Sequence, residues 1–173
     1  ILWGGGRRMS ELCGAVASVQ LKKLPSIVEH MRASKARIKA MLAGTPGLGF
    51  RRLNDPEGDT GAFLILTLED EARAVAAAER MRDGGLDGAI RVADYHLHIY
   101  FNVAALVNKV PLSPAGNPWS LPENAESAYD YSKGACPASD ALFARSILVS
   151  IPSRLTEAQE RRMADIIRSA VAP

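Results

Sequence analysis

The chain has 173 residues, of which 47% are hydrophobic, so it is long enough to bury a core in a single domain. Its 21 basic and 19 acidic residues leave a formal charge of +2, which argues against a surface built to attract nucleic acid or anionic membranes. No apolar run approaches the roughly 18 residues of a membrane span. We expect a cytoplasmic protein in which Cys13 and Cys136 are reduced thiols in or near the core.

The first predicted elements are helical. Ser10 is a suitable N-cap, and apolar residues follow it at helical spacing. Pro25 should end or kink this helix, and a second apolar stripe over residues 27–42 predicts either a second helix or the continuation of one long kinked helix. We interpret the basic residues of this second part as a solvated face: Arg32, Lys35, Arg37 and Lys39.

The pattern then changes to one typical of short strands and connecting helices. The alanine-rich stretch 69–83 predicts a helix that ends at Gly84 and Gly85. Alternation or continuous apolar character predicts strands over residues 48–53, 62–68, 90–92 and 97–101.

The last third begins with a long segment, residues 110–137, that is rich in proline and also holds aromatic residues. A loop of this length in a compact domain is usually functional or packed against a partner. The sequence then predicts a short helix over 139–145 and a strand over 147–151. A capping box at Thr156 and Gln159 predicts the start of a final helix. These elements predict one α+β domain over residues 1–173, a small antiparallel sheet covered by helices.

Two segments carry candidate chemistry. Glycines 4–6 can direct several backbone N–H groups at one point, and the helix behind them adds the positive end of its dipole, so this entrance is suited to an anion. On a strand, Asp94, His96, His98 and Tyr100 would share one face. That face is interpreted as turned toward a cofactor or substrate, as a structural histidine pair, or, with weaker support from the spacing, as part of a metal site.

These stretches together resemble the C-terminal small domain of the DegT/DnrJ/EryC1/StrS family of fold-type-I pyridoxal-phosphate sugar aminotransferases. The resemblance covers nearly the whole chain. Its middle part is similar to the branch that aminates eight-carbon keto sugars of the Kdo type. The stretches that carry it are residues 4–12, 20–24, 58–63, 98–100, 136–140, 146–152 and 155–157.

The resemblance implies a homodimer in which a Gly-x-Asn-x-Arg-Met stretch of one protomer approaches the cofactor phosphate of the other. Gly4, Arg8 and Met9 match that stretch, whereas Gly6 stands where asparagine is usual. Phosphate binding here would therefore rest on backbone N–H groups, helped by an arginine. The cofactor-binding residues expected from this comparison are Gly4, Gly5, Gly6, Arg7 and Arg8, and the substrate-binding residues are His96, His98 and Tyr100.

The resemblance also implies that the residue carrying the cofactor covalently, a lysine of the large domain, lies upstream of Ile1. No lysine of this chain occurs in a matching context. We therefore expect the chain to be the C-terminal part of a longer protein and to be inactive alone, with pyridoxal 5'-phosphate held mainly by the large domain. The intact enzyme would transfer an amino group from glutamate or glutamine to a keto sugar, in amino-sugar synthesis for cell-surface polysaccharide such as lipopolysaccharide.

Two alternatives stay open. The family includes dehydratases in which histidine replaces the upstream lysine, and the same fold would suit a non-catalytic binding or regulatory module. A nucleic-acid-binding module is less favoured, because the charge is balanced and no basic stripe is interleaved with aromatic residues.

Overall fold

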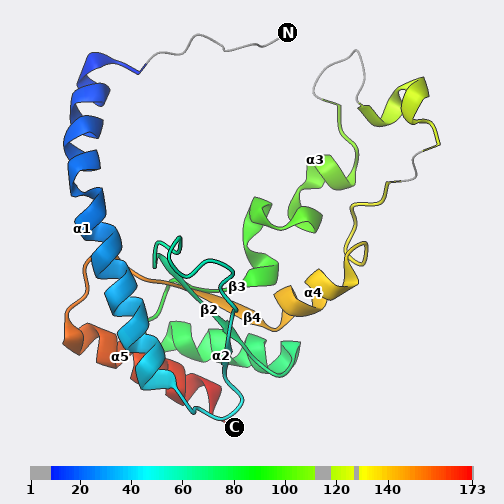
Figure 1. The fold of residues 1–173 in the computed structure, drawn as a ribbon. Coiled ribbons are helices and arrows are strands. Elements are labelled where there is room, and N and C mark those ends of the chain that lie inside the picture. Colours follow the sequence, from blue (N-terminus) through cyan, green and yellow to red (C-terminus); the bar gives the residue numbers. More distant parts are fainter. Residues whose placement is uncertain (1–8, 112–117, 127–128, 173) are drawn as a thin grey trace.

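The computed structural model describes residues 9–111, 118–126 and 129–172 (Figure 1). Its helices and strands, in chain order, are α1 (Glu11–Leu42), β1 (Gly49–Phe50), β2 (Phe63–Thr67), α2 (Glu71–Asp83), β3 (Ala89–Arg91), α3 (Ala104–Val107), α4 (Pro137–Ala144), β4 (Ser146–Ser150) and α5 (Glu157–Val171).

The strands form one antiparallel sheet in the order β1-β2-β4-β3. Val149 of β4 lies between Leu64 of β2 and Ala89 of β3, so the last strand along the chain occupies the centre of the sheet. The predicted α+β class with a small antiparallel sheet is confirmed. The strand expected over residues 48–53 is shorter than predicted, because only Gly49 and Phe50 pair with β2 as a ladder.

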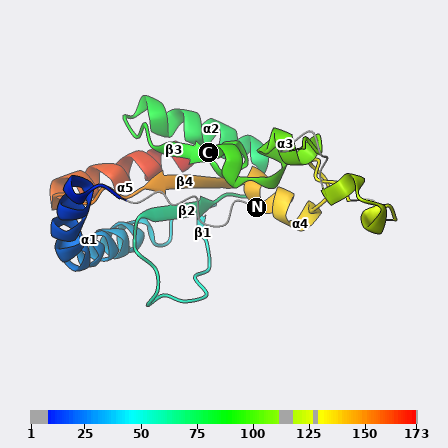
Figure 2. The ribbon, with the colours of Figure 1, turned by 90° about the horizontal axis from the view of Figure 1, so that it is seen from above.

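The core lies between the sheet and two helices on one of its faces. Helices α2 and α5 lie together on that face (Figures 1 and 2) and contact one another. Alternation along β2 points Leu64 and Leu66 into this core, whereas Phe63 on the other face is 41% exposed. The residues of α5 buried there are Met163, Ala164, Ile167, Ala170 and Val171, whereas Ile166 is only partly buried.

Local capping explains where α2 and α5 begin. The Asp70 side chain accepts a hydrogen bond from the backbone N–H of Arg73 at 2.8 Å. At α5 the predicted capping box is present, since Thr156 accepts from the backbone of Gln159 and the Gln159 side chain accepts from the backbone of Thr156. The start of α5 is therefore where the predicted capping box places it, whereas α2 begins at Glu71, two residues after the predicted start.

Helix α1 is one continuous helix of 32 residues with Pro25 inside it, and its two halves differ in environment. The second half is packed against α5 and buries Ser34, Lys35, Ile38 and Leu42. The first half rises away from the sheet (Figure 1) and leaves apolar side chains exposed, including Leu12 at 76%. Cys13 lies in this exposed half and Cys136 is also exposed, so the expectation that both are core or near-core thiols is wrong.

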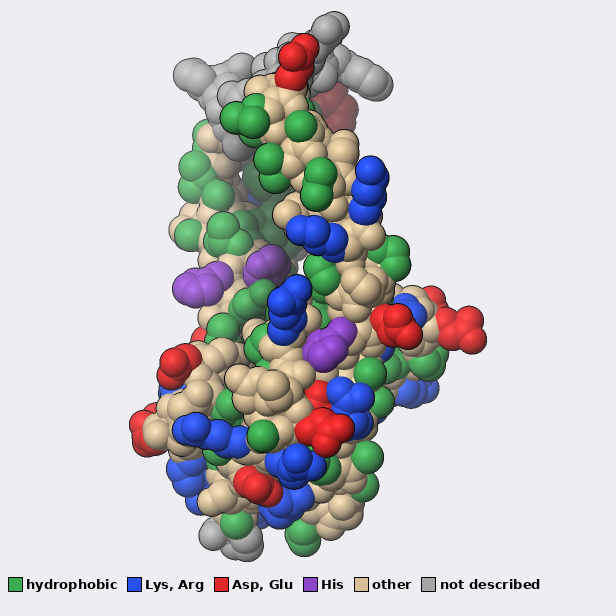
Figure 3. All heavy atoms as spheres, turned by 90° about the vertical axis from the view of Figure 1, so that its left-hand side faces the viewer, with side chains coloured by type: hydrophobic (Ala, Val, Ile, Leu, Met, Phe, Trp, Pro, Cys, Tyr) green, Lys and Arg blue, Asp and Glu red, His purple; other side chains and the backbone are tan. Residues whose placement is uncertain are grey.

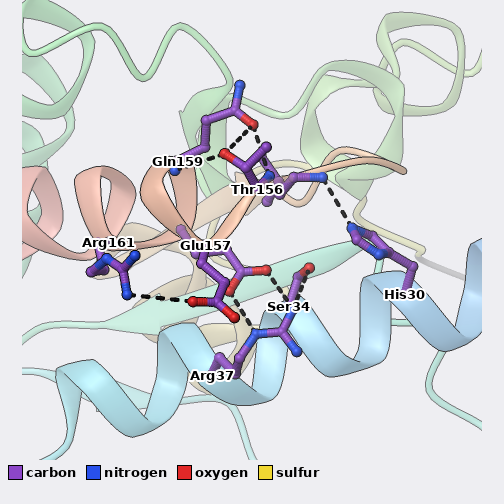
Figure 4. A network of polar contacts seen from close by, with 9 residues as sticks. His30, Ser34, Arg37, Thr156, Glu157, Gln159 and Arg161 are labelled. Atoms are coloured by element: carbon purple, nitrogen blue, oxygen red, sulfur yellow. Dashed lines mark hydrogen bonds and ion pairs between the residues drawn. The ribbon is translucent and has the colours of Figure 1, made fainter.

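A polar network joins the second half of α1 to the start of α5 (Figure 4). The Arg37 guanidinium donates to both carboxylate oxygens of Glu160 at 2.6 Å each, and the Glu160 side chain is only 1% exposed. Nearer the proline, the His30 ring accepts a hydrogen bond from the backbone N–H of Leu155 at 3.0 Å. The Arg37 and Ser34 side chains hold the pKa of Glu160 at about 2, in spite of the opposing effect of burial.

The other basic residues of α1 hold the loop between β1 and β2. Lys35 is 6% exposed and its ammonium lies 2.6 Å from the Asp59 carboxylate. Arg32 donates to the backbone carbonyls of Glu57 and Asp59. Gly61 has φ +77° and lies so close to the α1 backbone that a Cβ there would be 2.5 Å from the backbone nitrogen of Arg32.

The interpretation of these basic residues as a solvated face is correct for the exposure of Arg32 and Arg37 and wrong for Lys35, and none of the four is without a contact. Lys35 is buried in an ion pair, Arg32 and Arg37 bind the loop and α5, and the Lys39 ammonium lies 5.2 Å from the centre of the Phe50 ring. Helical periodicity shows which residues share a face, but it contains no information about the segment that covers that face.

The Glu160 ion pair gives the first prediction. Because the folded-state pKa of Glu160, about 2, lies below the ordinary value of 4.5, the pair stabilises the fold above pH 4.5, and this stabilisation is lost as the pH falls toward 2. Glu160→Gln should lower the free energy of unfolding by about 1–3 kcal/mol at neutral pH. The difference from wild type should shrink as the pH falls, as measured by urea unfolding at several pH values.

The matched control is Glu157→Gln, one turn away on the surface. Its side chain is 73% exposed and its oxygen lies 3.5 Å from Arg161, so the change should be within about 0.5 kcal/mol. Equal effects of the two variants, or a Glu160→Gln difference that does not depend on pH, would contradict this account of the network.

Candidate functional site

The segment that carries the predicted substrate-binding residues follows β3 and is not a strand. It consists of three short 3-10 turns, Val92–Asp94, His96–His98 and Tyr100–Asn102. Its backbone bonds are local, for example from the N–H of His98 to the carbonyl of Tyr95 at 3.2 Å. The predicted strand over residues 97–101 is therefore wrong.

The backbone conformation of His96 and the spacing of the buried side chains explain why this segment forms turns and not a strand. His96 has φ +42°, which is incompatible with an extended strand. The residues that this segment buries are Ala93 and Ile99, six positions apart, and the Asn102 side chain closes the segment by donating to the carbonyl of Ala93 at 2.9 Å. This spacing suits turns with about three residues each better than the alternation of a strand.

The three predicted substrate-binding residues do not share one face. His96 and His98 are both exposed, and the His98 ring stacks on Tyr95 with 4.4 Å between the ring centres. The Tyr100 hydroxyl instead lies 2.9 Å from each carboxylate oxygen of Asp140. The structure thus presents two imidazoles to solvent and directs the phenol toward the fold.

Tyr100 and Asp140 hold the segment against the beginning of α4. Asp140 is 9% exposed and accepts a hydrogen bond from the backbone N–H of Gly134 at 2.7 Å. The Tyr100 oxygen accepts one from the N–H of Cys136 at 3.1 Å. Burial, with a further contribution from the Asp140 carboxylate, raises the pKa of Tyr100 against the opposing effect of the Cys136 N–H, so the phenol stays protonated and donates to Asp140.

A second contact fixes the start of the segment. The Arg91 guanidinium lies 2.7 Å from the Asp94 carboxylate and 3.2 Å from that of Glu71 on α2. Asp94, which the sequence placed beside the histidines, is therefore bound to Arg91. The exposed imidazoles are carried by a segment that is tied to α2 at one end and to α4 at the other.

Within the described ranges no three His, Cys, Asp or Glu side chains come together in a way that would hold a metal ion. A lysine that binds pyridoxal phosphate needs an accessible amine in a pocket. The buried lysine of the described chain, Lys35, is committed to Asp59 and does not meet this requirement.

The predicted phosphate-binding residues Gly4, Gly5, Gly6, Arg7 and Arg8 lie outside the described residues. Met9 and Ser10 are described, and the Ser10 hydroxyl accepts from the backbone N–H of Cys13 at 3.2 Å, which confirms the predicted N-cap. In the sequence, the last glycine of the segment stands four residues before this N-cap.

Sequence reasoning missed Asp140 and Arg91, the two residues that position the segment. Asp140 lies in the first turn of α4, where a carboxylate is favoured by the helix dipole, and in the stretch 136–140 that carries the family resemblance, but neither signal indicates its contact with Tyr100. Its partner Tyr100 is 40 residues away, so no local pattern links them.

All three histidines of the chain can be seen from the side on which α1 lies (Figure 3). No helix of the described residues is long and apolar enough to span a bilayer. A comparison with known protein families finds none whose sequence profile matches this chain.

The Tyr100 contacts give the second prediction. Tyr100→Phe removes the donor to Asp140 and the acceptor for the Cys136 N–H, so it should lower the midpoint of urea unfolding and speed proteolytic cleavage around residues 95–102. His98→Ala removes only an exposed ring stacked on Tyr95 and should leave the midpoint nearly unchanged. A larger loss of stability for His98→Ala than for Tyr100→Phe would show that the roles are reversed.

Proposed function

We propose that this chain is the small domain of a pyridoxal-phosphate-dependent sugar aminotransferase of the DegT/DnrJ/EryC1/StrS family, which moves an amino group from glutamate or glutamine to a keto sugar. The proposal rests on the sequence resemblance at both ends of the chain and on compatibility with the α+β fold. One structural observation carries it further: the first half of α1, directly behind the glycine segment, is apolar and uncovered.

That half of α1 has the character of an interface. The exposed fraction is at least 47% for each of Leu12, Val16, Val19, Leu21 and Leu24. A helix that is apolar on several faces is normally buried, and a contiguous apolar surface marks a contact with another protein surface. In the proposed assembly the large domain and the partner subunit cover it.

The arrangement also supports a composite active site. The first half of α1 and the segment with His96 and His98 both lie on the side of the sheet opposite α2 and α5 (Figure 1). A large domain seated on that side would face both. In the proposal, Gly4 to Arg8 contact the cofactor phosphate across the dimer, and His98, oriented by its stack on Tyr95, contacts the sugar.

The roles of the three predicted substrate-binding residues are revised accordingly. His96 and His98 are accessible to a ligand, and an imidazole can donate or accept a hydrogen bond with a sugar hydroxyl. Tyr100 acts through Asp140 as a positioning residue that holds this segment in place. When bound, the cofactor supplies the electron sink for amino transfer, while this chain contributes binding and orientation.

Gly6 stands where asparagine is usual in the family, so a side-chain donor to the phosphate is missing. For this reason the second candidate function is a non-catalytic module of the same fold. The dehydratase alternative depends on the upstream residue. Sequencing upstream of Ile1 separates the three: a lysine in the family's context supports the aminotransferase, a histidine supports the dehydratase, and neither supports the module.

The third prediction concerns cofactor binding by the chain alone. No lysine of the chain occurs in the sequence context of the family's cofactor lysine, so titration with pyridoxal phosphate should give no saturable lysine-bound absorbance that survives dialysis. The same titration of the longer protein should give one. A stable, lysine-specific adduct in residues 1–173 that one lysine substitution removes would overturn the assignment of the cofactor lysine to the large domain.

The fourth prediction separates the two parts of the proposed site in the longer protein. Arg8→Ala should weaken cofactor affinity by about one to two powers of ten, because a charge-assisted contact to phosphate is lost. His98→Ala should raise the KM for the sugar or lower kcat with little change in cofactor affinity. Arg161→Ala, on the exposed surface of α5, is the control and should change neither.

Steady-state kinetics and cofactor titration of the three variants measure these effects. Wild-type values for both Arg8→Ala and His98→Ala would refute the transfer of family roles to these positions. Equal loss of folding in both would assign them structural roles.

A further inference from the structure

We propose that a cleft between α1 and the turn before α5 binds a phosphate monoester. This site is separate from the glycine segment and from the histidine segment, and it does not rest on the proposed function. The cleft has a volume of about 360 Å³ and is lined by Gln20, Lys23, Ser26, Ile27, His30, Ser153 and Arg154.

The cleft is formed by two segments held in fixed relation. Gln20, Lys23, Ile27 and His30 recur at intervals of three and four, so they line one face of α1. Ser153 and Arg154 come from the turn that enters α5. The bond from the Leu155 N–H to the His30 ring, at 3.0 Å, fastens this turn to α1 at the edge of the cleft.

The two cations of the cleft have no carboxylate partner within the described part of the chain. The nearby acidic residues of α5 are already occupied, Glu157 by Arg161 and Glu160 by Arg37. The cleft beside Arg32, Lys35 and Asp59 differs, because its Lys35 and Arg32 are already bound to the loop. Lys23 and Arg154 are therefore available to an anion from outside the chain.

The uncharged side chains of the cleft add hydrogen-bond donors and acceptors, which favour a ligand that has hydroxyl groups beside its phosphate. Because the His30 Nε2 atom accepts from Leu155, the proton of the neutral ring is on Nδ1, which is a donor. The Ser26 hydroxyl donates to the Lys23 carbonyl at 2.9 Å, which leaves its oxygen as an acceptor. Gln20 and Ser153 add groups that donate and accept.

This set suits a dianion with a small hydroxylated substituent. Two cations bind the phosphate, and the amide and hydroxyl groups bind the rest of the molecule. Figure 3 shows the side of the molecule on which α1 lies, where basic and acidic side chains are both exposed.

The test is calorimetric titration of the chain with inorganic phosphate and with glycerol 3-phosphate at low ionic strength. We expect saturable binding at one site, tighter for the ester. Lys23→Gln and Arg154→Gln should each weaken binding about tenfold, since each removes a charge-assisted contact. Both side chains are exposed, so the variants should keep the wild-type unfolding midpoint.

Two matched variants make the result specific. Lys22→Gln removes the same charge from the adjacent position of α1, outside the cleft, and should leave the affinity within about twofold. His30→Gln retains an acceptor for the Leu155 N–H and should affect the ester more than inorganic phosphate. Amide chemical-shift changes confined to residues 20–30 and 153–155 would place the ligand in the cleft.

Three results would overturn the proposal: no saturable binding of either probe, unchanged affinity in the Lys23→Gln/Arg154→Gln double variant, or an equal loss in Lys22→Gln. The last would show that net charge alone attracts the anion.

Discussion

The buried carboxylate of Glu160 is the constraint on which the placement of α1 depends. Glu160 sits on α5, which covers the sheet, and it is almost completely removed from solvent. A carboxylate in that position needs a cation, and the two-pronged contact with Arg37 supplies it with defined geometry. The pair therefore helps to fix the position of α1 along its own axis and its rotation relative to α5. The contact between Lys35 and Asp59 then holds the loop between β1 and β2 against the same helix.

Short-range signals predicted much of the fold. Ser10 and Thr156 mark helix starts because each side chain accepts a hydrogen bond from the backbone N–H three residues ahead, and such contacts need no tertiary context. The central strands β2 and β4 were also predicted, since the continuous apolar runs of buried strands are distinctive. Gly61 belongs to a stretch that the sequence singled out, but its reason became clear only from the close approach of α1.

The candidate site could be predicted less well, because its geometry depends on partners that are distant in sequence. The alternation around His96 and His98 is compatible with a strand, and contacts with Asp140 and with the carbonyl of Ala93 favour turns instead. The order of residues along the chain shows that two imidazoles are close. It does not show that the phenol beside them is directed into the fold.

Pro25 divides α1 in a way that affects binding as well as shape. The proline has no N–H to donate to the preceding turn, and the part before it, residues 11–24, has little tertiary packing. The end of this part that is farthest from the packed half, residues 11–19, has neither tertiary packing nor a preceding helical turn to support it, so helix formation there is coupled to its being covered. The affinity for whatever surface covers it then includes the free energy of ordering the helix. Helix propensity at Gly14, where an added Cβ meets nothing within 4 Å, therefore modulates that affinity.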